Sequence, residues 1–145
     1  MGRDDARKIF VTHPRTLAEN TEGGLWIGWS FGAQVLVEMF HQTHVRPSQL
    51  VLINPCYGRR PDAPRACFVS SRTSSAHARC AIDVPTLVIL GDKDSVTPRV
   101  SAEPLAKQIP HVEVFVVRQG THFVLLEFPE LINLRIEKFL REQVG

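Results

Sequence analysis

The sequence has few of the features that mark membrane or nucleic-acid-binding chains. Its 145 residues include 17 basic and 15 acidic ones, so the formal net charge is only +2. So small a charge argues against a nucleic acid or an anionic membrane surface as partner. The chain also lacks any apolar run of the roughly 18 residues that a membrane-spanning helix needs. We therefore expect neither nucleic acid nor a membrane as partner.

Cysteine is also scarce. Cys56, Cys67 and Cys80 are odd in number and have no C-x-x-C spacing, which favours neither a disulfide framework nor a zinc site. We expect no metal and no nucleotide or redox cofactor. The first ten residues, MGRDDARKIF, are charged and lack the apolar segment of a signal peptide, so a cytoplasmic location is expected.

What the chain does have is the composition of a globular domain. Hydrophobic residues make up 43% and charged residues 22%, and the length suits one domain over residues 1–145. Residues 1–22 form a poorly matched leader with an irregular pattern. Residues 56–81 are rich in Arg, Ser, Ala and Pro, and we interpret them as a reduced cap or a loop.

Between these segments, short apolar runs alternate with helical periodicity. Runs that are apolar at every position indicate strands buried on both faces. This pattern predicts a three-layer α/β fold, with a mostly parallel sheet of about four strands and flanking helices. The predicted strands are LWIGW (25–29), LVLIN (50–54), TLVIL (86–90) and HVEVFVV (111–117), and the predicted helices are 31–42, 100–109 and 129–143. In the last helix, the apolar stripe is assigned to Leu131, Leu134, Ile136 and Leu140.

The stretch Gly28-Trp29-Ser30-Phe31-Gly32 joins the first of these strands directly to a helix. A strand–turn–helix setting is what a G-x-S-x-G nucleophile elbow requires, since the sharp turn exposes the serine hydroxyl above the sheet. We expect both glycines to avoid clashes where strand and helix pass closely. The backbone N–H of Phe31, at the helix N-terminus, is the predicted donor to an oxyanion.

A serine hydroxyl needs a base, and the base needs an acid that orients it. Asp94 follows the third predicted strand and His122 follows the fourth, so both belong to the sheet edge that also carries Ser30. Asp92 competes with Asp94 for the acid position because it lies nearer to the strand end. Trp29 and Phe123 are predicted to line a substrate pocket, although simple packing explains them as well.

With these pieces in order, the chain resembles the carboxyl-terminal portion of the α/β-hydrolase superfamily. The matching stretches are LWIGWSFGA, VPTLVILGDKDSVTP and GTHFVLLEFPELINLRIEKFL. The resemblance implies Ser30 as nucleophile, His122 as general base and then acid, and Asp94 as the residue that orients His122. GWSFG also resembles the elbow of thioesterases of polyketide and peptide synthesis. The implied function is a serine hydrolase that cleaves an ester, thioester or related acyl bond of a small-molecule substrate.

The departure from the family pattern lies before the elbow. Only 29 residues precede Ser30, whereas one βα repeat takes about 30. The amino-terminal strands and the oxyanion loop are therefore expected to be missing, which describes a truncated fold with an exposed apolar strand edge. The alternative function is a catalytically inactive, hydrolase-like chain that acts as a binding module or has no independent role. A second copy of the chain or a partner could cover the open edge.

Overall fold

The computed structural model of the chain describes residues 22–56 and 82–143. Within them, four strands form one sheet in the order β1-β2-β3-β4, and every neighbouring pair is parallel. The strands are β1 (Leu25–Trp29), β2 (Gln49–Ile53), β3 (Thr86–Gly91) and β4 (Val112–Val117), and the helices are α2 (Phe31–Gln42), α3 (Arg99–Ala106), α4 (Val124–Glu127) and α5 (Pro129–Glu142). The predicted α/β fold with a parallel sheet is confirmed.

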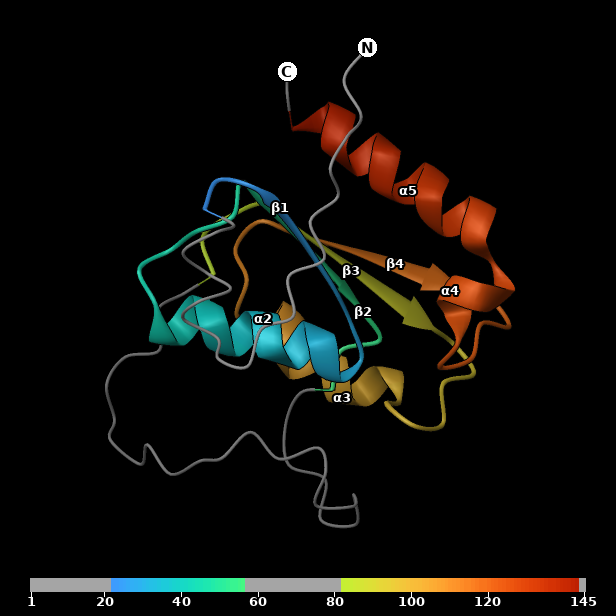
Figure 1. Cartoon of the computed structure of the whole chain (residues 1–145). Coiled ribbons are helices and arrows are strands. Elements are labelled where there is room, and N and C mark those ends of the chain that lie inside the picture. Colours follow the sequence, from blue (N-terminus) through green and yellow to red (C-terminus); the bar gives the residue numbers. More distant parts are fainter. Residues whose placement is uncertain (1–21, 57–81, 144–145) are drawn as a thin grey trace.

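Helices cover both faces of the sheet, which makes three layers (Figure 1). On one face α2 and α3 enclose an apolar core with buried residues such as Phe40 and Leu105. On the other face α4 and α5 enclose a second core around Phe139. Successive residues of β2 point alternately into these two cores, Leu52 into the first and Ile53 into the second. Burial on both faces explains why the strand sequences are continuously apolar.

The strand and helix bounds agree closely with the sequence expectation, apart from α4. This short helix follows His122 directly, and the sequence interpretation assigned no element there. The expected leader (residues 1–22) and the expected cap (residues 56–81) lie outside the described residues except for Glu22 and Cys56, so both stay predictions. In the described part of the chain, no helix has the length and apolar character needed to cross a membrane.

The buried face of α5 differs from the predicted one. Leu134 is 64% exposed and Leu131 is also exposed, whereas Ile132 and Phe139 are buried. The predicted stripe is confirmed for Ile136 and Leu140, which pack on the core, and was wrong for Leu131 and Leu134. Leu134 and Ile136 are only two positions apart, a spacing that does not share one helical face. Ile132, Ile136 and Phe139 follow the helical spacing of four and three, and they pack on the sheet.

β1 is an outer strand of the described sheet, with β2 on one side. Ile27 on this strand is 50% exposed, and Leu25 is also exposed. Within residues 22–56 and 82–143, β1 is therefore an apolar edge of the sheet. Coverage of this edge by a second copy or a partner stays a prediction.

Candidate active site

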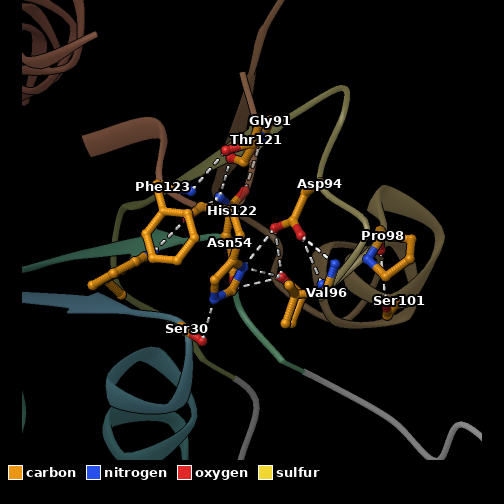
Figure 2. A network of polar contacts seen from close by, with 12 residues as sticks. Ser30, Asn54, Gly91, Asp94, Val96, Pro98, Ser101, Thr121, His122 and Phe123 are labelled. Carbon is orange, nitrogen blue, oxygen red and sulfur yellow. Dashed lines mark hydrogen bonds and ion pairs between the residues drawn. The ribbon is translucent and has the colours of Figure 1, made fainter. Parts of the chain in front are cut away.

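The turn between β1 and α2 holds Ser30 in a strained conformation. Its φ is 54° and its ψ is −118°, a region that side-chain-bearing residues rarely adopt. Ser30 precedes α2, but its hydroxyl makes no capping hydrogen bond to the helix. The hydroxyl instead lies 2.8 Å from Nε2 of His122 (Figure 2). The strained turn thus directs the serine away from its own helix and toward the histidine.

The two glycines of the elbow differ in the steric clash that a Cβ would cause at each position. A Cβ at Gly28 would lie 2.6 Å from Cα of Ala33, so strand and helix pass too closely there for a side chain. A Cβ at Gly32 would meet no atom within 4 Å in the described part of the chain. The steric prediction is therefore confirmed for Gly28 and was wrong for Gly32, which lies on an open side of α2.

The strain at Ser30 gives a stability prediction. Ser30→Gly and Ser30→Ala both remove the hydroxyl, but only glycine adopts a positive φ without steric cost. We expect the free energy of unfolding of Ser30→Gly to exceed that of Ser30→Ala by about 1 kcal/mol. Urea denaturation of the two variants measures this difference. Equal stabilities would show that the turn carries no strain.

Ser30, His122 and Asp94 form a continuous hydrogen-bonded series. The Nδ1 atom of His122 lies 2.9 Å from Oδ2 of Asp94, and its Nε2 atom faces Ser30. The Asp94 side chain is fully buried, and that of His122 is nearly so. Because a carboxylate only accepts hydrogen bonds, we assign the Nδ1 proton to His122 as the donor. Nε2 is then free to accept the hydroxyl proton of Ser30.

The carboxylate of Asp94 is held by its own loop. Oδ1 accepts hydrogen bonds from the backbone N–H groups of Val96 and Thr97, both at 2.8 Å. Oδ2 accepts from the hydroxyl of Thr97 at 2.7 Å as well as from His122. A buried charge is tolerated only when its hydrogen-bonding sites are filled, and here about four are. Asp92, the alternative acid, is exposed, and the described contact to His122 comes from Asp94.

The remaining predicted site residues surround this series. α2 begins at Phe31, so the N–H of Phe31 is among the helix-terminal amides that have no intrahelical acceptor. Phe123 is 52% exposed, and its ring lies 5.9 Å from that of Trp29. The indole N–H of Trp29 donates to the carbonyl oxygen of His122 at 2.9 Å. Trp29 therefore holds the backbone of the loop that carries His122 through this hydrogen bond. That Trp29 and Phe123 contact a substrate stays a prediction.

Three further residues of this network were not anticipated from the sequence. Asn54 and Thr97 are buried beside His122 and Asp94, and Glu127 accepts two hydrogen bonds from Thr121. A local signal existed for Thr97, because an aspartate often binds backbone N–H groups two and three residues ahead. For Asn54 the signal was an asparagine directly after a buried strand, where a left-handed turn residue fits. In residues 22–56 and 82–143, no group of three or more His, Cys, Asp or Glu side chains is arranged to hold a metal ion.

Comparison with known sequences finds similarity over about half of the chain. Residues 67–129 match the family described as alpha/beta hydrolase fold. The proline iminopeptidase PfmaB of Pestalotiopsis fici is 34% identical over 61 residues, which are 42% of this chain and 22% of that protein. The poly(3-hydroxyalkanoate) depolymerase of Ectopseudomonas oleovorans is 32% identical over 76 residues, 52% of this chain and 26% of that protein. The matched region thus spans about a quarter of each relative.

Solved structures show the same fold over more of the chain. The putative non-heme bromoperoxidase BpoC of Mycobacterium tuberculosis H37Rv superposes with a TM-score of 0.69 at 18% sequence identity. The superposition covers 89% of this chain and 71% of that one. At so low an identity the likeness concerns the fold alone.

Proposed function

Because the chain belongs to the α/β-hydrolase superfamily, we propose that it is a serine hydrolase that cleaves an ester, thioester or related acyl bond. The observation that carries this proposal is the hydrogen-bonded series from Ser30 through His122 to Asp94, with distances of 2.8 and 2.9 Å. A serine at a strained turn, a histidine within reach and a buried carboxylate behind it are the parts that acyl transfer needs. The names of the two curated relatives also favour a hydrolase.

In the first half of the proposed reaction, Nε2 of His122 takes the proton of Ser30 as Oγ attacks the acyl carbon. Positive charge then develops on the imidazole, and the buried carboxylate of Asp94 stabilises it and holds the ring in place. Negative charge develops on the acyl oxygen, and the N–H of Phe31 at the start of α2 is the proposed donor to it. His122 then gives its proton to the leaving alcohol or thiol, and Ser30 carries the acyl group.

In the second half, water replaces the leaving group. His122 removes one proton from the water while the water oxygen attacks the acyl carbon of the ester on Ser30. Collapse of the intermediate releases a carboxylic acid and returns the proton from His122 to Oγ of Ser30. The resting state is restored, and no other reagent is consumed.

The test of this proposal is covalent labelling. A fluorophosphonate probe should react with Ser30 in the folded chain, because the probe requires an activated serine hydroxyl. We expect His122→Ala to slow the labelling by at least about 10³-fold, since the base is lost. Peptide mapping by mass spectrometry identifies the labelled residue. The proposal is contradicted if folded protein is not labelled, or if labelling does not depend on His122. Either result favours the alternative of a hydrolase-like chain without turnover.

A further inference from the structure

Asn54 occupies a central place among the loops that carry the site. It directly follows β2, the strand between β1, which leads to Ser30, and β3, which leads to Asp94. It is completely buried, and its φ of 42° lies in the left-handed region. A polar residue in a strained conformation at a buried strand end is costly unless its contacts compensate for it. The preceding strand is apolar, so burial alone does not account for an asparagine here.

The side-chain amide of Asn54 connects two loops that come from β3 and β4. Its Nδ2 atom donates to the carbonyl oxygens of Thr121 and His122, both at 3.1 Å. Its Oδ1 atom accepts from the backbone N–H of Gly91 at 2.8 Å. Both donor hydrogens and the acceptor oxygen are therefore used. The amide links the end of β3 to the two peptide groups on either side of His122 (Figure 2).

The main chain of Asn54 adds two more links. Its N–H donates to the carbonyl oxygen of Ile89 in β3, and its own carbonyl oxygen lies 3.2 Å from the hydroxyl of Thr97. The same hydroxyl lies 2.7 Å from Oδ2 of Asp94. Because it has a single proton, it donates either to Asp94 or to the carbonyl oxygen of Asn54 at any one time. Asn54 therefore contacts the acid loop as well as the histidine loop.

The carbonyl oxygen of His122 is the point at which this network meets the imidazole. It accepts one hydrogen bond from Asn54 and a second, at 2.9 Å, from the indole of Trp29. These donors lie at the ends of β2 and β1, and together they fix the backbone from which the imidazole extends. We propose that Asn54 is a positioning residue: with Trp29 it anchors the backbone of His122 and so keeps the ring between Ser30 and Asp94.

The effect of this inference on kcat rests on the proposed function, because it requires that His122 transfers a proton. An error of about 1 Å in the placement of a reacting group can cost about 10²-fold in rate. Release of the His122 backbone should therefore lower kcat, because proton transfer is affected, and leave KM nearly unchanged. Loss of overall stability alone would not produce that separation at temperatures where the variant is folded.

The decisive variant is Asn54→Gly, because glycine retains the left-handed backbone and removes the amide. We expect kcat for p-nitrophenyl acetate, measured well below the unfolding temperature, to fall about 10–100-fold, with KM changed less than about threefold. Thr86→Val is the matched control. Thr86 is also completely buried with a side-chain hydrogen bond, to the carbonyl of Val84, but it lies at the opposite end of β3. A kcat within about twofold of wild type in folded Asn54→Gly, or an equal loss in the control, overturns the inference.

A spectroscopic measurement separates this inference from the proposed function. The Nδ1 proton between His122 and Asp94 should give a far-downfield proton NMR resonance in the wild-type chain, present in Thr86→Val and absent in His122→Ala. We expect it to shift or disappear in Asn54→Gly, and an unchanged resonance in that folded variant contradicts the inference. A wild-type chain that shows the resonance but no labelling refutes the proposed function alone.

If Asn54→Gly does not fold, Trp29→Phe provides the second variant, because phenylalanine retains an aromatic ring and loses the N–H that binds the same carbonyl. We expect the resonance of this variant to shift or disappear relative to wild type and its kcat to fall about three- to tenfold. An unchanged resonance together with an unchanged kcat would show that the His122 carbonyl needs no anchor.

Discussion

Replacement of Ser30 by alanine is expected to lower kcat for p-nitrophenyl acetate by roughly 10⁴–10⁶-fold. The reason is that, in the proposed reaction, Ser30 supplies the attacking oxygen, and the covalent route is lost without it. Alanine leaves the buried pair of His122 and Asp94 in place, so the variant should remain folded. Initial rates at saturating ester, with far-UV circular dichroism of the same sample, measure the effect.

The double variant Ser30→Ala/His122→Ala sharpens this result. Residues that act as one unit are strongly non-additive, so the double variant should be no slower than the slower single variant. Multiplied losses would show that the two side chains act independently. Equal rates in Ser30→Ala and wild type would assign any observed ester cleavage to another group.

Gly91→Ala is expected to cost about 3–5 kcal/mol of the free energy of unfolding. A Cβ at Gly91 would lie 2.4 Å from the carbonyl oxygen of Gly120 and 2.6 Å from that of Thr121. These are backbone atoms of the histidine loop, so the loop itself must move. Its displacement breaks the hydrogen bond from Lys93 to Gly120 and strains the one from Gly91 to Asn54. Urea denaturation and the labelling rate of Ser30 measure both consequences.

Gly32→Ala is the matched control for this prediction. Its added Cβ meets no described atom within 4 Å, and alanine is the better helix former by about 0.8–1 kcal/mol. We therefore expect Gly32→Ala to be neutral or slightly stabilising. The steric explanation for Gly91 fails if the two variants have the same stability, or if labelling in Gly91→Ala is as fast as in wild type.

Much of the fold follows from local patterns that the sequence states directly. Each strand is a short apolar run, and the elbow is a contiguous motif, so the order Ser30, Asp94, His122 could be predicted together with its sheet edge. The parallel pairing also follows, because strands buried on both faces alternate with helices. These inferences need no knowledge of how distant residues meet.

What could not be predicted depends on contacts across the sheet. The role of Asn54 arises because Thr121 and His122 come within reach of its amide, 67 and 68 positions along the chain. The open side of Gly32 likewise depends on how α2 is rotated against its neighbours, which composition does not encode. The buried face of α5 was accessible from the sequence, because Ile132, Ile136 and Phe139 follow helical spacing, and Leu134 was assigned to the wrong side against that spacing.

The parallel order of the sheet has a consequence for folding kinetics. Ser30 and His122 are 92 positions apart, and β4 must be in place before the two side chains meet. Parallel strands are joined by long crossovers. The chain loses the conformational entropy of closing these loops before the contacts between strands can stabilise the sheet. If Ser30 reacts as proposed, we expect its reactivity to appear late in refolding, once β4 has paired with β3. The gain of labelling should then follow completion of the sheet, whereas circular dichroism also responds to helices that form earlier.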